Sequence, residues 1–437
     1  MVKSPQKSAM YIARGFSDQG WRLLLLLVPP LSLTVFICVY ATPLSPFSTF
    51  APLASFFFNR TVNSTTSADD PCVLPLNRSQ PVGVRSWKDE LYRSRMAVCL
   101  VGGARRFELT GPSIVENILN LYPNSDLFLH SPLDKNAFKF SLLKVAPRIA
   151  TVRIFQPKPI PETEAEVRVL TAANSPNGIQ GLLQYFNLVE GCLTMIEEYQ
   201  TQNNFKYDWV VRTRVDGYWN APLGPQNFIA GHYLVPSGST YGGLNDRLGI
   251  GDFNSSKVAL SRLSLIPKLD SAGLRLLNSE TSFKAQLTTY GVPFVTKRLP
   301  FCIVTDRKYR FPPYRFGVPV ATLSSPGPLS GAKCRPCTRV CEGSCVAGVM
   351  PLLNKGWSWT NWENGTLKLC DAHAEWERGW EKIFDEVAGK KRAAVRKRIS
   401  GLKLKQCVND FNEMNRRSSK WESPPPEEIC KLGVGQN

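Results

Sequence analysis

The feature that most constrains the fold is a series of short apolar segments separated by helical patterns. Four such segments lie at residues 97–101, 125–130, 151–155 and 209–211. An amphipathic pattern over residues 179–199, with apolar residues every three or four positions, precedes the last of them. Strands that alternate with helices are typical of an α/β domain. The sequence therefore predicts a mostly parallel, mixed sheet flanked by helices, a Rossmann-like architecture, over residues 91–320.

A capping pattern follows the first predicted strand. Ser113 and Glu116 have the spacing of a capping box, in which a hydroxyl and a carboxylate satisfy the first backbone N–H groups of a helix. Ile114 and Ile118 then supply an apolar face. We therefore expect a helix that begins at Ser113.

Glycine and charged residues follow two of the predicted strands. In open α/β sheets, ligands bind in the crevice beyond the carboxyl ends of the strands. Glycine allows close approach to the backbone, guanidinium groups match phosphate, and a carboxylate can hold a divalent cation. A structural ion pair between Asp216 and a neighbouring arginine is the alternative. The candidates are Gly102, Gly103, Arg105, Arg212 and Arg214 for a phosphorylated ligand, and Asp216 for a metal.

Several motifs over residues 95–310 resemble those of nucleotide-sugar-dependent glycosyltransferases of the A-type fold. They are the glycine–arginine pattern from Gly102 to Arg105, "DLFLH" at the second strand, "RTRVD" after the fourth, "NDRLGIGD" from Asn245, and a later helix with Glu280 at its start. The resemblance implies transfer of a sugar from a nucleotide-sugar donor to a glycan or glycoprotein acceptor. The whole chain also resembles a family of plant membrane proteins, which implies no activity.

The resemblance implies roles for individual residues. Asp126 is a hypothesis for the donor base and ribose, and Asp246 and Glu280 are the candidates for the base that an inverting enzyme needs. A turn carboxylate and an acid in the first turn of a helix are the respective structural alternatives.

One departure from the family pattern concerns the metal. The usual motif is Asp-x-Asp, but here Arg214 stands in the first position, before Asp216. Mn²⁺ or Mg²⁺ could bind through Asp216 and the donor diphosphate, or Arg214 could neutralise the diphosphate in a metal-independent enzyme. The missing aspartate also favours an alternative function, that of a catalytically inactive lumenal binding or scaffold protein.

The N-terminal region predicts a membrane anchor. The segment 23–41 is apolar, and basic residues dominate residues 1–22, so the positive-inside rule places them in the cytosol. A cleaved signal peptide is the competing interpretation. Residues 42–90 have the composition of a flexible stem, and residues 321–437 form a Cys- and Trp-rich lumenal extension. We expect a single-pass type II protein of the Golgi membrane, with its C-terminal domain in the lumen.

Sequons and cysteines fit a lumenal location. Motifs for N-glycosylation lie at Asn59, Asn63, Asn77, Asn254 and Asn364. There are twelve cysteines, of which Cys38 falls in the predicted anchor. The odd remainder predicts a free thiol or an intermolecular bond, hence a disulfide-linked oligomer, and Cys99 is our hypothesis for a buried free thiol. The cluster of Cys334, Cys337, Cys341 and Cys345 could bind zinc, but an oxidising lumen favours disulfides.

The chain is basic, with a formal net charge of +18. Such a charge suits an acidic partner: phosphate groups, an anionic membrane surface or nucleic acid. We expect no nucleic acid partner, because a lumenal domain would rarely meet one, and we interpret the basic segment 389–398 as a solvated helix face.

Overall fold

The four predicted strands form neighbouring parts of one sheet in the computed structural model, which describes residues 87–434 except 174, 176, 310–317 and 353–365. This sheet has eight strands in the order β14-β3-β2-β1-β4-β7-β6-β8. Strand β7 is antiparallel to its two neighbours, and all the other pairs in this sheet are parallel. The predicted mixed, mostly parallel α/β sheet is therefore confirmed. The strands are β1 (Met96–Val101), β2 (Ser125–Pro132), β3 (Ile149–Phe155), β4 (Trp209–Arg214), β6 (Tyr233–Pro236), β7 (Leu248–Asp252), β8 (Phe294–Lys297) and β14 (Ser418–Glu422).

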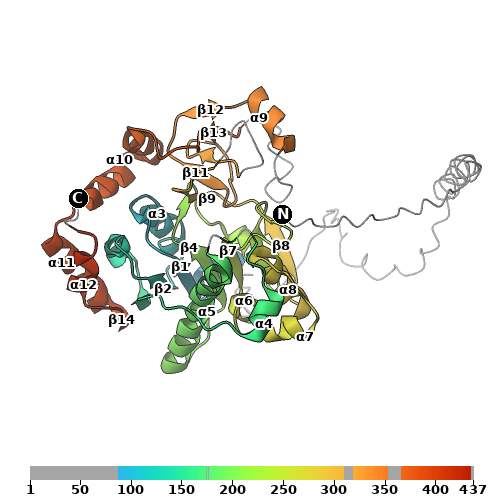
Figure 1. The fold of residues 1–437 in the computed structure, drawn as a ribbon. Helices are drawn as coiled ribbons and strands as arrows, with labels where there is room; N and C mark the ends of the chain where they lie inside the picture. Colours follow the sequence, from blue (N-terminus) through green and yellow to red (C-terminus); the bar gives the residue numbers. More distant parts are fainter. Residues whose placement is uncertain (1–86, 174, 176, 310–317, 353–365, 435–437) are drawn as a thin grey trace, which may run out of the picture. The chain divides into compact units, whose positions relative to one another are not determined.

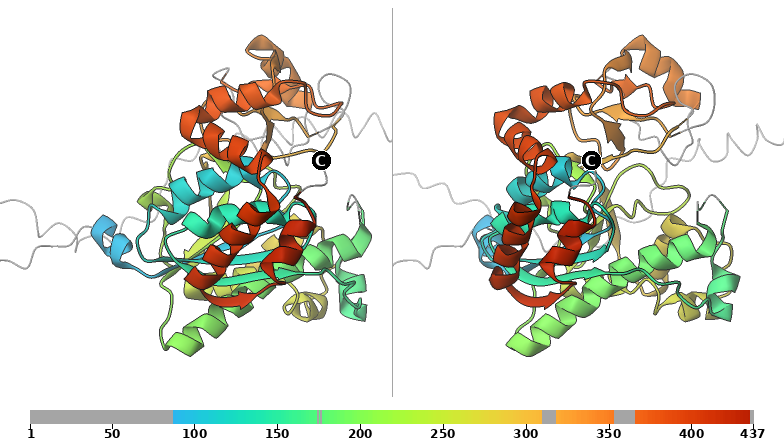
Figure 2. Two further views of the ribbon diagram at one scale, coloured as in Figure 1. Left: turned by 90° about the vertical axis from the view of Figure 1, so that its left-hand side faces the viewer. Right: turned by 60° about the vertical axis from the view of Figure 1, so that its left-hand side comes forward.

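Helices cover both faces of this sheet. The predicted amphipathic helix is α5 (Gly178–Asn203), and it packs on one face, whereas the C-terminal helices lie on the other (Figures 1 and 2). The further helices are α2 (Trp87–Arg93), α3 (Phe107–Ile114), η1 (Val115–Leu119), η2 (Ala137–Val145), α4 (Glu164–Val169), η3 (Pro225–Asn227), α6 (Phe253–Leu260), α7 (Ile266–Ser271), α8 (Ser279–Thr289), α9 (Ser344–Val349), η4 (Met350–Leu352), α10 (Trp380–Ser400), α11 (Leu404–Arg417) and α12 (Pro426–Lys431).

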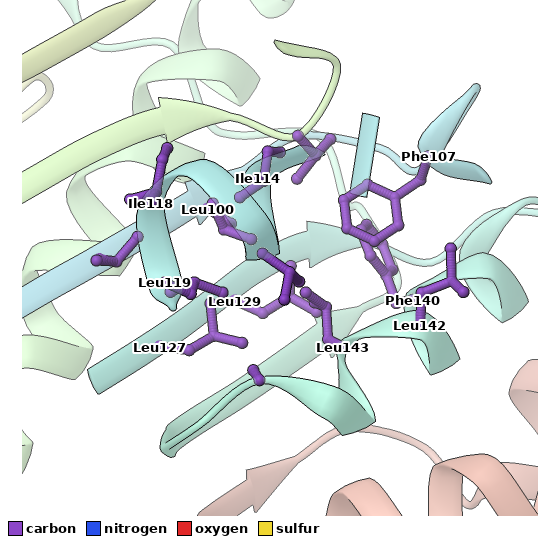
Figure 3. Close-up of a cluster of buried hydrophobic side chains, with 14 of the residues drawn as sticks. Leu100, Phe107, Ile114, Ile118, Leu119, Leu127, Leu129, Phe140, Leu142 and Leu143 are labelled. Atoms are coloured by element: carbon purple, nitrogen blue, oxygen red, sulfur yellow. The ribbon is translucent and has the colours of Figure 1, made fainter. Parts of the chain in front are cut away.

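The two faces follow from the alternation of side chains along each strand. In β1, Val98 and Leu100 belong to the core on the face covered by α3, η1 and η2. Figure 3 shows Leu100 in this cluster together with Leu127 and Leu129 of β2. The intervening residues Ala97, Cys99 and Val101 belong to the core beneath α5. Because β1 is buried on both faces, its sequence is a continuous apolar run.

A second sheet joins the predicted extension to the main domain. It has six strands in the order β12-β13-β10-β11-β9-β5, so β9 of the first part pairs with β5 on one side and with β11 of the extension on the other. Strand β14 of the extension also adds to the edge of the main sheet, beside β3. Residues 82–437 accordingly cluster as one unit. The strands are β5 (Gly217–Trp219), β9 (Phe301–Val304), β10 (Ala321–Thr322), β11 (Lys333–Arg335), β12 (Arg339–Cys341) and β13 (Leu369–Cys370).

The capping box predicted at Ser113 is wrong. The helix begins earlier, at Phe107, and Ser113 lies inside it, fully buried. Its Oγ donates to the carbonyl oxygen of Thr110 and accepts from the backbone N–H of Trp219, 2.7 Å and 2.9 Å away. The hydroxyl thus serves a tertiary contact that the local pattern does not show.

The predicted free thiol at Cys99 is also wrong, because Cys99 forms a disulfide with Cys192 of α5. The cysteine cluster forms disulfides, as the lumenal hypothesis favours, and the remaining pairs are Cys302–Cys334, Cys337–Cys370, Cys341–Cys345 and Cys407–Cys430. All ten cysteines of the described residues are therefore paired within the chain.

The predicted anchor, stem and cytosolic tail lie outside the described residues, as do the sequons at Asn59, Asn63, Asn77 and Asn364. Within the described part of the chain, no helix combines the length and apolar character needed to cross a membrane. Asn254 is exposed in the first turn of α6, and its glycosylation stays a prediction.

Candidate functional site

A cleft lies at the carboxyl ends of β1, β2 and β4, where the topology predicts a ligand crevice. It comprises two cavities. The strand-end cavity, of about 480 Å³, is lined by Gly102, Gly103, Arg105 and Asp216 among others. The carboxylate cavity, of about 640 Å³, is lined by Asp246 and Glu280 among others. The two cavities adjoin, because they share Ser175, Gly181, Tyr185, Arg214, Arg307 and Lys333.

The turn after β1 brings the backbone to the edge of the strand-end cavity. Gly102 has a φ of +119°, a left-handed conformation that L side chains rarely adopt. A Cβ there would also lie 3.3 Å from the Cγ2 atom of Val215. The adjacent turn after β4 is tied to it by a hydrogen bond from the Val215 N–H to the Val101 carbonyl, 3.0 Å long. Gly102 and Gly103 therefore line the strand-end cavity, where the sequence predicts a phosphorylated ligand.

The pair formed by Arg214 and Asp216 is the main feature at the end of β4. The Arg214 Nε and Nη2 atoms donate to the two carboxylate oxygens of Asp216 over 2.8 Å and 2.6 Å. Burial alone would raise the pKa of Asp216, but the charge and hydrogen bonds of Arg214 outweigh it and hold that pKa well below its usual range. The structural ion pair that the sequence left as an alternative is thus present, and Arg214 still lines both cavities.

The side chains around Asp216 do not fit a divalent cation. Mg²⁺ and Mn²⁺ take oxygen ligands, usually from one or two carboxylates. Both oxygens of Asp216 are already held by Arg214, and the position two residues earlier carries that same arginine. Within the described residues, no three His, Cys, Asp or Glu side chains are grouped so that they could hold a metal ion.

Cationic side chains gather where the two cavities meet. Arg214, Arg307 and Lys333 line both cavities, and Arg105 lines the strand-end cavity. The pKa of Lys333 is held well below its usual range, chiefly by burial and then by the positive charges of Arg247 and Arg214, although Asp216 opposes them. An anion that entered the junction would relieve this repulsion.

The candidate bases Asp246 and Glu280 are brought together at the carboxylate cavity. The loop before β7 packs against the start of α8 so closely that a Cβ on Gly243 would lie 2.0 Å from the Glu280 carbonyl oxygen. Leu244 donates its N–H to that carbonyl oxygen over 3.1 Å. The hydroxyl of Ser279, next to Glu280, donates to the Asp246 carboxylate.

The two carboxylates have opposite pKa shifts. Burial, together with the negative charge of Asp246, raises the pKa of Glu280 to about 7, although Arg247 and Arg262 act in the other direction. The pKa of Asp246 is lowered: burial would raise it, but the charges of Arg262 and Arg212 and the Ser279 hydrogen bond prevail. Two acids whose environments separate their pKa values can take different roles, and Glu280 has the value of a general base at neutral pH.

Arg212 does not reach the ligand cleft, contrary to its predicted contact with the donor. Its guanidinium is buried and donates to the Asp246 carbonyl oxygen and, over 3.3 Å, to the Tyr185 hydroxyl. Tyr185 donates to the same carbonyl over 2.8 Å. Arg262, whose charge also helps to lower the pKa of Asp246, donates to the carbonyl oxygen of Ser279 over 2.8 Å. Arg212 therefore positions Asp246.

Asp126 lies away from the cleft. It is the second residue of β2 and pairs in register with Ala97, near the amino end of β1, whereas the cleft is at the carboxyl ends. Its carboxylate accepts hydrogen bonds of 2.8 Å from the Tyr207 hydroxyl and from the Nε of Arg148. We leave Asp126 out of the site on these grounds.

The cleft residues that were not predicted from the sequence include Lys333, Arg307 and Tyr185. Lys333 and Arg307 come from the region around the second sheet, and Tyr185 projects from α5. In the sequence, Tyr185 stands out only as a phenol within an otherwise apolar helix face. Lys333 stands out only as a lysine next to Cys334 in a dense cluster of cysteines. Neither feature indicates a ligand without the tertiary structure.

Comparison with known proteins defines the family. The model of the family described as "Domain of unknown function (DUF7796)" matches residues 91–436. The chain belongs to this family. The match begins within α2 and covers both sheets and the cleft, so the domain of the DUF7796 family includes the cysteine-rich extension.

Other comparisons add little about activity. No curated protein matches the chain. The apo crystal structure of mouse xyloside xylosyltransferase 1 is similar to part of the chain, with 11% sequence identity and a TM-score of 0.29 over 47% of this chain and 84% of that one. A likeness of this extent carries no argument about what the DUF7796 chain does.

Proposed function

We propose that the chain is a glycosyltransferase that transfers a sugar from a nucleotide-sugar donor to a hydroxyl group of a glycan or glycoprotein. The observation that carries this proposal is the junction of a cationic strand-end cavity with a cavity that presents Glu280. The cations suit a diphosphate, and a base at the adjoining cavity suits a hydroxyl acceptor. Four of the five motifs that resemble A-type glycosyltransferases contribute residues to the same cleft, and "DLFLH" does not.

The proposed reaction is a single displacement. The acceptor hydroxyl gives its proton to the Glu280 carboxylate while its oxygen forms a bond to the anomeric carbon. The bond from that carbon to the diphosphate oxygen breaks, and its electron pair leaves with the nucleoside diphosphate. Arg105, Arg214, Arg307 and Lys333 would stabilise the charge that develops on the leaving group.

The proposed location is the Golgi lumen, with the protein anchored by residues 23–41. Five disulfides within the described residues support an oxidising compartment.

Thermal unfolding with nucleotides tests the proposal. We expect one class of nucleoside diphosphate, and its nucleotide sugar, to raise the melting temperature of the purified chain. At one hundred times its dissociation constant, a ligand raises the free energy of unfolding by about 2.7 kcal/mol. The matching nucleoside, which lacks the diphosphate, serves as the control and should cause no shift.

Two results would contradict the proposal in different ways. The absence of any shift with uridine, guanosine, cytidine or adenosine diphosphates would remove the nucleotide site altogether. A shift without sugar transfer to any glycan acceptor would favour the inactive binding protein.

A further inference from the structure

We propose that the cleft binds the diphosphate of its ligand without a metal ion, and that Lys333 of the cysteine-rich extension supplies the charge a metal would otherwise provide. This inference rests on the proposed function, which it deepens by assigning how the donor is held. It also makes the extension part of the site.

The second sheet places Lys333 beside the Arg214–Asp216 pair. Lys333 of β11 is in register with Ile303 of β9, which in turn is in register with Gly217 of β5, the residue after Asp216. The Val304 N–H also donates to the Asp216 carbonyl oxygen over 2.9 Å. Pairing across three strands therefore fixes the position of Lys333 relative to the end of β4.

A disulfide strengthens this arrangement from the opposite side of the strand. Successive side chains of a strand point to opposite faces, so Cys334 points into the core when Lys333 points toward the cleft. Cys334 is bonded to Cys302 of the neighbouring β9. The backbone that carries the lysine is thus fixed covalently as well as by hydrogen bonds.

The charges in the cleft favour this role. Within the described residues, the Lys333 ammonium has no hydrogen-bonded or ion-paired partner, although it lines both cavities. Asp216, the carboxylate expected to hold a metal, is neutralised by Arg214. Because Arg214 is already paired with Asp216, the net positive charge that a diphosphate at the junction would meet comes from Lys333, Arg307 and Arg105, which have no ion pair among the described residues.

Calorimetric titration in excess EDTA tests the inference. The probes are inorganic pyrophosphate, UDP and GDP, and the proteins are the wild type, Lys333→Met, Lys333→Arg and the control Lys268→Met. Lys268 is an exposed residue of α7 outside the cleft. We expect the wild type to bind in EDTA and Lys333→Met to bind about 10- to 100-fold more weakly, as for the loss of one charge-assisted hydrogen bond. Lys333→Arg, which keeps the charge, should recover part of the affinity, and Lys268→Met should bind as the wild type does.

Each contrary result has a separate meaning. Binding by the wild type only after Mn²⁺ or Mg²⁺ is added would overturn the inference and leave the proposed function standing. Equal affinity of Lys333→Met and the wild type in EDTA would also overturn it. No binding of any probe, with or without metal, would overturn both. Lys333→Met should fold, because methionine is apolar and of similar length and the lysine has no partner to lose among the described residues.

Discussion

Glu280→Gln is expected to lower kcat for sugar transfer by about 10²- to 10⁴-fold, the usual contribution of a general base. Glutamine keeps the shape of the side chain but cannot accept the proton of the acceptor hydroxyl. Since the proposed function places the donor diphosphate at the strand-end cavity, the affinity for the nucleotide should change little. Initial rates and nucleotide binding, measured on the same preparation, separate the two effects.

The pH dependence gives an independent readout of the same residue. Because the pKa of Glu280 is raised to about 7, the free enzyme loses its base below that pH, and kcat/KM should rise through pH 7 and level off above it. Asp246→Asn removes the negative charge that contributes to this shift. The midpoint of the profile should then move to lower pH, an effect that a purely structural role for Asp246 would not produce.

The sign of the stability effect follows from the same shift. An acid whose pKa is higher in the folded protein than in the unfolded chain binds its proton more tightly when folded. The contribution of Glu280 to the free energy of unfolding should therefore fall as the pH rises from about 4.5 to about 7. Asp246, with a lowered pKa, contributes in the opposite sense, so stability that depends on it is lost as the pH falls.

Glu164→Gln is the matched control for Glu280→Gln. Glu164 also lies in the first turn of a capped helix, α4, but its side chain is 91% exposed. It should have wild-type kcat and an unchanged pH profile. If Glu280→Gln retains kcat within a few-fold of the control, Glu280 is only a first-turn acid stabilised by the helix, and the assignment of the base is wrong.

The sequence predicts four of the eight strands of the main sheet, because these four carry clear local patterns. The apolar runs at β1, β2, β3 and β4 are long enough to identify buried strands, and the 3.6-residue period of α5 is clear. Topology then brings the ends of β1 and β4 together, so Gly102, Arg105, Arg214 and Asp216 are correctly placed at one edge.

Residues that depend on distant pairing could not be predicted. Lys333 reaches the cleft only through the register of β5, β9 and β11, and these strands are three or four residues long. Strands this short carry no periodicity that would identify them. Arg212 shows a related limit: it lies inside β4 and not at its end, and its side chain turns to the backbone of Asp246.

Cys99 illustrates the same limit for disulfides. Its apolar surroundings in β1 favour a buried thiol, yet its partner Cys192 is 93 residues away on the helix that packs over that strand. The number of cysteines constrains how many can pair, but the pairing itself depends on which elements pack together.

Removal of the Cys99–Cys192 disulfide should cause the largest loss of stability among the five disulfides. A cross-link between residues 93 apart removes much of the conformational freedom of the unfolded chain, and the chain-entropy relation gives about 4.6 kcal/mol. We expect Cys99→Ala/Cys192→Ala to lower the free energy of unfolding by about that amount in denaturant titrations.

Two other disulfides, which close shorter loops, test whether the loss of stability depends on loop length. Cys407 and Cys430 are also fully buried but are only 23 residues apart, which predicts a loss of about 3.4 kcal/mol. Cys341 and Cys345 are four residues apart, which predicts about 1.9 kcal/mol. If the three double variants lose the same free energy, loop closure does not set the effect. Alkylation of Cys99 in the unfolded, non-reduced wild-type protein, detected by mass spectrometry, would show that the bond is absent.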